Sequence, residues 1–377
     1  MKETIQRLVE AWGPSGYEYQ VRKLIEEEVR ALADEVIVDP LGNLICRMGE
    51  GGAKIMVDAH MDEIGVMATF IEPTTGFIRF SPLGGLLANT LTGSRVRFEN
   101  GVTGVMAVHE LHGASRTSLP DLDAFYIDVS DGSDQPPVEL GSPAVFWRPY
   151  EERGTRLISK AMDDRIGCAI AIEAMRRLKR RRSKPANTVY FAFVVQEEVG
   201  LRGAGPAAYN IDPDVAISLD VTATGDVLKD HKMAVKLGGG AAIKIHDPGH
   251  IVPPQVRDWM IARAEADKIP YQRELLTGGT TDSARIQTSR AGVPSGTISI
   301  PCRYVHTTSE TVDIRDVEAS VNLLVGLVAN PVEFLTAPPE AAAESAAPAR
   351  RRGRPKKAVP TEAPKKRGRK KKVESAE

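Results

Sequence analysis

The sequence predicts an α/β fold that carries a β-rich insertion. Short apolar runs typical of buried strands alternate with segments of helical periodicity in both the first 65 residues and the stretch from 156 onward. Between residues 66 and 155 the pattern changes to short β-rich runs separated by turn signals. The chain has 377 residues, 42% of them hydrophobic, which is enough for a sizeable core and for two domains.

Two helices are expected at the start of the chain, separated by the Gly- and Pro-containing turn at 13–16. The first, over residues 1–12, is charged and amphipathic, unlike a signal peptide. The second is expected over about 17–36, because apolar residues recur there at helical spacing. A strand over 54–59 follows and ends at His60.

The inserted segment holds β-rich runs at 76–80, 94–98, 102–108 and 124–129. Their spacing predicts a small β-barrel or sandwich with no helix of its own. The predicted organisation is therefore a discontinuous α/β domain (1–65 and 156–336) interrupted by a β domain (66–155).

The α/β pattern returns near residue 155. A helix is expected from the cap at Asp163 to about Lys179, and the last helix over about 314–335. Between them we expect a further helix at about 254–268. We also expect three strands, at 188–195, 215–219 and 296–300.

Residues 337–377 form a basic tail. This segment has 13 Lys and Arg against 5 Asp and Glu, which leaves a net charge of +8 on the tail and −9 on residues 1–336. Because it contains no Phe, Ile, Leu or Trp, it cannot offset the entropy of ordering by burial, and we expect it to be disordered.

The remaining composition points to the cytoplasm. Cys46, Cys168 and Cys302 are odd in number and far apart, so reduced thiols are expected rather than a disulfide framework. No apolar run is expected to be long enough to span a membrane.

Polar side chains follow four of the predicted strands at the point where each strand ends. The carboxyl ends of strands in an open α/β sheet form the ligand crevice. We therefore expect these side chains to converge there: His60 and Asp62, Glu197 and Glu198, Asp220, and His306.

Imidazole and carboxylate are ligands for divalent zinc, cobalt or manganese. Two such ions roughly 3.5–4 Å apart need a carboxylate that both share, and a further carboxylate to take a proton from water. The Glu197–Glu198 pair can supply one ligand and one base, although spacing alone does not say which is which.

Each of these residues also has a purely structural interpretation. An acidic pair at a strand end is commonly a solvated loop, Asp220 can cap a turn, and Asp163 with Asp164 can be only a helix cap. His306 taken alone is more commonly structural than a ligand. Their joint placement at sheet ends is what favours a site.

Four segments carry a resemblance to the TET-type, family-42 metallo-aminopeptidases, also described as glutamyl or deblocking aminopeptidases and sometimes as endoglucanases. The resemblance covers about residues 1–336, and its segments are VDAHMDEIG (57–65), KAMDDRIG (160–167), VQEEVGLRGA (195–204) and SIPCRYVH (299–306).

The resemblance implies the role of each site residue. His60 would bind one metal ion and His306 the other, Asp163 would bridge the two, and Glu198 or Asp220 would complete each side. Glu197 would be the general base and acid, acting on a bridging water, and Asp62 would orient and polarise His60.

The resemblance also implies a fold and an assembly. The fold is a three-layer, phosphorylase/hydrolase-like α/β catalytic domain with an inserted β-barrel that mediates dimerisation. Dimers would assemble into a tetrahedral homo-dodecamer that encloses the active sites and admits short or unfolded peptides.

A segment near the family's substrate pocket is similar but altered. Residues 278–283 read GGTTDS, with an additional Thr, and with Ser where the family usually has Ala. Gly279, Thr280 and Asp282 are candidate substrate-binding residues, and the departure leaves the side-chain preference open.

The tail resembles AT-hook peptides, in which Arg-Gly-Arg-Pro lies in the narrow minor groove of A·T-rich DNA. The candidate nucleic-acid-binding residues are Arg352, Gly353, Arg354 and Pro355; a second basic run at 365–372 lacks the proline. A generic polybasic tail that binds any polyanion, or the chain's own acidic body, is the alternative.

Two other functions stay open from the sequence. One is a related dinuclear deacylase or carboxypeptidase, and the other is a DNA-associated protein whose peptidase body is a scaffold. The endoglucanase name has little support, because glycosidases usually rely on two carboxylates without a metal.

Overall fold

The structure, a computed structural model, describes residues 1–108, 120–132, 137–181, 185–228 and 232–336. Residues 1–336 form one compact unit. The tail at 337–377, with the predicted nucleic-acid-binding residues Arg352, Gly353, Arg354 and Pro355, lies outside the described residues.

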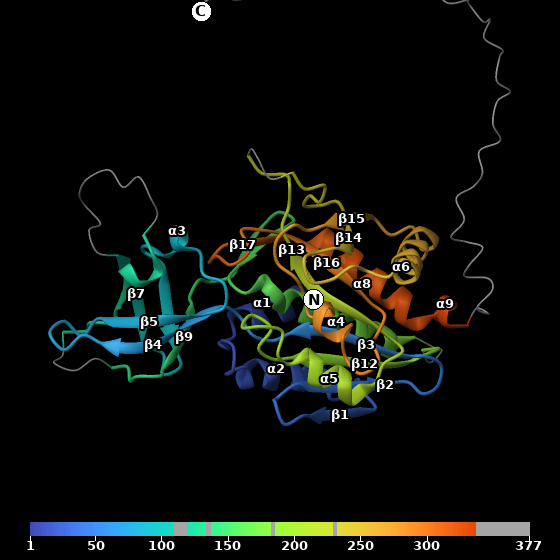
Figure 1. The fold of residues 1–377 in the computed structure, drawn as a ribbon, viewed down its shortest axis with the longest axis horizontal. Coiled ribbons are helices and arrows are strands. Elements are labelled where there is room, and N and C mark those ends of the chain that lie inside the picture. The colour runs from blue at the N-terminus through green and yellow to red at the C-terminus, as the bar shows by residue number, and fades with distance from the viewer. Residues whose placement is uncertain (109–119, 133–136, 182–184, 229–231, 337–377) are drawn as a thin grey trace, which may run out of the picture. The chain divides into compact units, whose positions relative to one another are not determined.

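A large mixed sheet forms the centre of the fold (Figure 1). Its order is β1-β2-β12-β3-β13-β16-β17-β11-β10, with β14 paired to β15 and β16. The four neighbours β12, β3, β13 and β16 run parallel, so their carboxyl ends lie at one edge. The strands are β1 (Glu35–Val38), β2 (Leu44–Met48), β3 (Lys54–His60), β10 (Glu151–Arg153), β11 (Arg156–Ser159), β12 (Thr188–Val194), β13 (Val215–Thr222), β14 (Ala241–His246), β15 (Tyr271–Leu275), β16 (Ser295–Arg303) and β17 (Glu310–Asp313).

Helices cover both faces of this sheet, which confirms the three-layer α/β prediction. Successive residues of a strand point to opposite faces, and in β3 Ile55 and Val57 join one apolar cluster while Met56 joins another. The first cluster includes residues of α1, α2, α4, α6 and α8, and the second those of α5 and α7. The helices are α1 (Lys2–Glu10), α2 (Tyr19–Val29), α3 (Ala88–Leu91), α4 (Met162–Arg180), α5 (Ala204–Ile211), α6 (Pro254–Ala266), α7 (Ser283–Ile286), α8 (Ile314–Ala329) and α9 (Glu333–Thr336), with a 3₁₀ turn at Leu122–Ala124.

The inserted segment folds as a closed antiparallel barrel with a hydrophobic core of its own, as the sequence predicts. Its strand order is β4-β5-β8-β7-β6-β9, and β10 already belongs to the main sheet. The short helix α3 is a correction to the expectation that the insertion has no helix. The barrel strands are β4 (Gly65–Ile71), β5 (Ile78–Leu83), β6 (Arg95–Phe98), β7 (Thr103–Val108), β8 (Phe125–Asp128) and β9 (Pro143–Phe146).

Two expected helices end earlier than their periodicity indicates. The second helix stops at Val29, because the chain then forms β1, in which Glu35 pairs with Arg47 of β2 both in register and by an ion pair of 3.0 Å. The last helix is divided into α8 and α9 by a break around Pro331, whose ring cannot continue an α-helix.

One segment does have the length and hydropathy of a membrane span, contrary to the sequence expectation. This segment is Ile314–Leu335. Its main part, α8, has ten buried residues and packs on α4, α6, β14 and β16. It therefore has the burial of a core helix.

A buried arginine joins the N-terminal helix to the sheet edge. Arg165 of α4 has no exposed surface. Its guanidinium donates to the carbonyl oxygens of Leu8 at 2.7 Å, Gly13 at 3.0 Å and Met61 at 2.6 Å, and pairs with Glu63 at 3.2 Å. Because a buried carbonyl without a donor is costly, this one side chain fixes the path of residues 8–13 beside β3.

Substitution Arg165→Met is expected to destabilise the fold by roughly 3–5 kcal/mol, because it leaves buried acceptors unpaired and removes one partner of a buried ion pair. Urea unfolding followed by intrinsic fluorescence measures the change. The matched control is Arg7→Ala, which removes partly exposed pairs with Glu27 and Glu28 and should cost no more than about 1 kcal/mol. Equal midpoints for the two variants would contradict the role given to Arg165.

Candidate metal centre

The predicted ligands converge at the carboxyl edge of the parallel strands. His60 is the last residue of β3, and Asp220 lies near the end of β13. Glu198 follows β12 by a short turn, His306 follows β16, and Asp163 lies in the first turn of α4. The parallel register of these strands explains why residues so distant in sequence meet.

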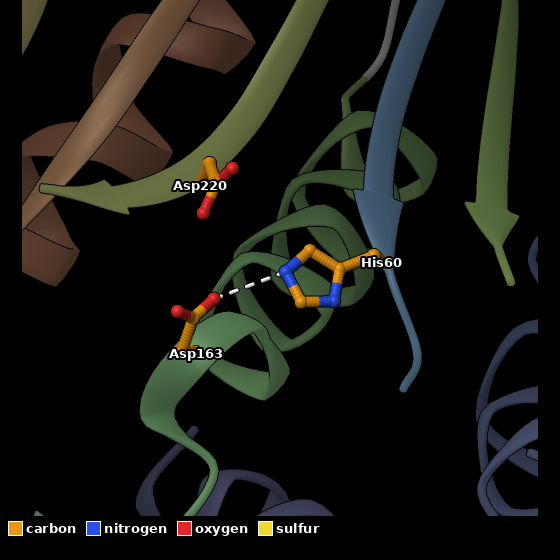
Figure 2. A group of neighbouring side chains, drawn as sticks. All are labelled: His60, Asp163 and Asp220. Carbon is orange, nitrogen blue, oxygen red and sulfur yellow. Dashed lines mark hydrogen bonds and ion pairs between the residues drawn. The ribbon is translucent and has the colours of Figure 1, made fainter. Parts of the chain in front are cut away.

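The first donor group consists of His60, Asp163 and Asp220 (Figure 2). All three are buried, and one ligand atom from each lies within 4.8 Å of the others. The Nε2 atom of His60 lies 3.0 Å from Oδ1 of Asp163. In Figure 2 the carboxylate of Asp220 points toward the space beside this pair.

The second donor group consists of Asp163, Glu198 and His306. The Nε2 atom of His306 lies 3.3 Å from Oδ2 of Asp163 and 3.2 Å from Oε2 of Glu198. Burial alone would lower the pKa of His306, but these two carboxylates outweigh it and raise the pKa to about 12. Asp163 therefore offers one carboxylate oxygen to each group.

Asp62 lies behind His60. Its Oδ1 atom is 3.4 Å from Nδ1 of His60, and its carboxylate accepts hydrogen bonds from the Ser15 hydroxyl and from the amides of Glu197 and Glu198. Burial alone would raise the pKa of Asp62, but these donors and His60 hold it below its usual value. The charged carboxylate fixes both the imidazole and the turn after β12.

Glu197 belongs to neither donor group. Burial raises its pKa well above the ordinary value; the neighbouring His60 opposes this shift, whereas Asp220 and Asp282 add to it. Glu197 is therefore a carboxylate that lies beside the donor groups but outside them.

Glu310 is a site residue that the sequence reasoning missed. Its Oε2 atom accepts from the amide of Asp163 at 3.0 Å, and its Oε1 atom accepts from the amide of His306 at 2.8 Å. One carboxylate thus holds the backbone of two candidate ligands. It lies at the start of β17, where nothing in the strand pattern marks it.

The donor sets fit divalent metal ions. Imidazole and carboxylate match zinc and its neighbours, and Oε1 of Glu198 is buried without a hydrogen-bond partner among the described residues. Burial, with the neighbouring acids, also raises the pKa of Asp220 and of Glu198. A cation placed here would remove the cost of burying these carboxylates.

The segment around Gly279 is less directly connected to the donor groups. Thr280 donates to Oδ1 of Asp247 at 2.9 Å. Asp282 precedes α7 without a side-chain capping hydrogen bond and is buried; its Oδ1 has no partner among the described residues, and burial raises its pKa to about 7. The charge of Asp282 contributes to the raised pKa of Glu197.

A three-layer α/β fold with imidazole and carboxylate donors at the carboxyl edge of its sheet is suited to metal-dependent hydrolysis. The sequence profile of the M42 glutamyl aminopeptidase family matches residues 42–323, and the chain belongs to this family. It is a peptide hydrolase, and more closely a metal-dependent aminopeptidase.

Individual relatives agree with this family. A protein of Acetivibrio thermocellus is 44% identical over 328 residues, which are 86% of this chain and 97% of that protein. The lysyl aminopeptidase of Pyrococcus furiosus is 34% identical over 88% of this chain and 98% of its own length. The solved structure of the Pyrococcus horikoshii TET1 peptidase, described as assembling into a tetrahedron or a large octahedral shell, has a TM-score of 0.77 at 32% identity, covering 87% of this chain and 98% of that one.

Proposed function

We propose that the chain removes N-terminal residues from short peptides with two divalent ions, one held by each donor group. The observation that carries this proposal is the position of Asp163, which offers one carboxylate oxygen to His60 and the other to His306. A dinuclear site needs a carboxylate that both ions share. We infer zinc or cobalt as the ions, with manganese as the third candidate.

When bound, the ions would polarise the scissile carbonyl and make a water molecule more acidic. Glu197 would take the proton from that water and return it to the leaving amine, because it is a carboxylate beside the donor groups that is not itself part of either group. Asp62 would keep the His60 ring oriented so that Nε2 faces the first ion. Asp282, with Gly279 and Thr280, is our candidate for contact with the substrate.

The test is an activity assay of the purified full chain. We expect release of the chromophore from aminoacyl-anilides, its loss after chelation, and its recovery when zinc, cobalt or manganese is added back. N-acetylated substrates should resist cleavage, because an aminopeptidase requires a free α-amine. Cleavage of the acetylated substrate at an equal rate would favour a deacylase or carboxypeptidase instead.

We also propose that the barrel within residues 66–155 mediates dimerisation and that the dimers form a dodecamer, with the catalytic domain made of 1–65 and 156–336. The likeness to the TET1 peptidase, which is described as assembling into a tetrahedron or a large octahedral shell, supports this. Light scattering on the eluted protein should give a mass of about twelve subunits; a monomer or an isolated dimer would refute it.

For the tail we propose nucleic-acid binding, supported by the Arg-Gly-Arg-Pro sequence at 352–355 and its net charge of +8. Gel shifts with A·T-rich and G·C-rich duplexes should show binding by the full chain that weakens steeply with salt. A 1–336 truncation that binds DNA as well as the full chain would refute a role of the tail.

A cytoplasmic location is also proposed, supported by three free, buried thiols at Cys46, Cys168 and Cys302.

A further inference from the structure

The barrel reaches the second donor group through two glycines. Gly84 and Gly85 directly follow β5. A Cβ atom on Gly85 would lie 2.9 Å from Nδ1 and 3.1 Å from Cε1 of His306, and one on Gly84 would lie 3.1 Å from Oε2 of Glu198. These separations are shorter than ordinary van der Waals contact, so the chain can approach the two side chains this closely only because it has no Cβ there.

A second contact comes from the segment after β9, which leaves the barrel at the same end as the two glycines, since Leu83 and Val145 both pair with Gly65. Arg148 lies just past β9, and its Nη1 atom donates to the hydroxyl of Ser309 at 2.5 Å. Ser309 lies in the same loop as His306. On the other side of this loop, Glu310 accepts a hydrogen bond from the His306 amide. The loop at 304–309 is therefore held between the main sheet and two points of the barrel segment.

The first donor group is held differently. His60 and Asp220 are on β3 and β13 of the main sheet, and the polar contacts described for His60 come from Asp62 and Asp163. The main sheet thus holds His60 and Asp220, whereas the barrel segment also contacts His306 and Glu198. Asp163 is the residue that the two groups share.

We propose that the barrel positions His306 and Glu198, so that binding of the second ion depends on the barrel and binding of the first does not. Gly85 and Arg148 are positioning residues in this account. It rests on the proposed two-ion function, and it assigns to the inserted barrel a part in building the metal centre in addition to the proposed assembly role.

Gly85 is the cleaner place to test the contact. Gly84 has a φ of +88°, so alanine there would add backbone strain as well as a methyl group. Gly85 lies outside the left-handed region, and alanine there adds only the methyl group that meets the His306 ring.

The experiment is a metal titration of the metal-free full chain, with cobalt or zinc against a competing chelator. We expect two ions in the wild type. In Gly85→Ala the second ion should bind about 10- to 100-fold more weakly, the cost typical of disturbing a group behind a ligand, while the affinity of the first ion stays unchanged. Arg148→Ala should weaken the same ion. The matched control is Gly205→Ala in α5, where the atoms nearest the new methyl group belong to the flexible side chain of Arg285.

The titration separates the outcomes. Folded Gly85→Ala protein that binds both ions like the wild type would overturn the proposal, and so would equal weakening of both ions. If Gly85→Ala does not fold, as judged by circular dichroism, wild-type affinity for the second ion in Arg148→Ala overturns it. A wild-type chain that binds one ion would instead overturn the two-ion function, and this is measured before any variant.

Discussion

Replacement of Glu197 by glutamine is expected to lower kcat by about 10²- to 10⁴-fold, the range that general acid–base catalysis contributes. Glutamine keeps the size of the side chain but cannot take the proton from water. Because Glu197 lies in neither donor group, the variant should still bind the metal ions of the wild type. The measurement is a pair of titrations, one of activity with an aminoacyl-anilide and one of bound metal.

The control for this variant is Glu27→Gln on the exposed face of α2, which should have wild-type activity. Full activity in Glu197→Gln would exclude the proton-transfer role. Loss of activity together with loss of bound metal would show that Glu197 is a metal ligand. Glu198 would then be the candidate for the general base.

The substitution Asp163→Asn is expected to weaken both ions, whereas Asp220→Asn should weaken one. Asp163 is the only residue present in both donor groups identified among the described residues. An amide is a poorer ligand for these ions than a carboxylate and carries no charge to compensate them. We expect the affinity for each ion to fall by at least about 10- to 100-fold, since mutation of a residue that only hydrogen-bonds to a metal ligand already costs that much.

Equilibrium dialysis against buffered zinc compares the two variants directly. If Asp163→Asn retained one ion at wild-type affinity, the aspartate would not be shared. His250→Asn, a substitution in a residue of neither group, provides the control for loss of a buried polar side chain, and should leave both ions bound.

The parts of the site that could be predicted from the sequence are those encoded locally. His60, Asp220 and the Glu197–Glu198 pair come at or just after apolar strand runs, and parallel pairing of β3, β12 and β13 brings them to one edge. Glu310 and Gly85 could not be found in this way. Their roles arise from contacts with His306 made across the fold, and neither has a local pattern that marks it.

The same reasoning explains two of the strands that the sequence analysis missed, β14 and β15. β14 and β15 contain Lys244 and Glu274, which are fully buried and pair at 3.0 Å. A charged residue in the middle of a short strand interrupts the apolar pattern by which a buried strand is recognised. The pair is buried where the two strands lie side by side, and Lys244 also pairs with Asp247 at 3.0 Å; both contacts are tertiary information.

The path of the chain has a consequence for its synthesis on the ribosome. The barrel strands all lie between residues 65 and 146, so every hydrogen-bonding partner within the barrel has been made once that stretch has emerged. Strand β3, by contrast, pairs with β12 and β13, which begin at Thr188 and Val215. The growing chain must therefore carry its central strand, with His60 at its end, for more than a hundred residues before either neighbour exists. During that interval the insertion, whose strands pair with one another, can already fold.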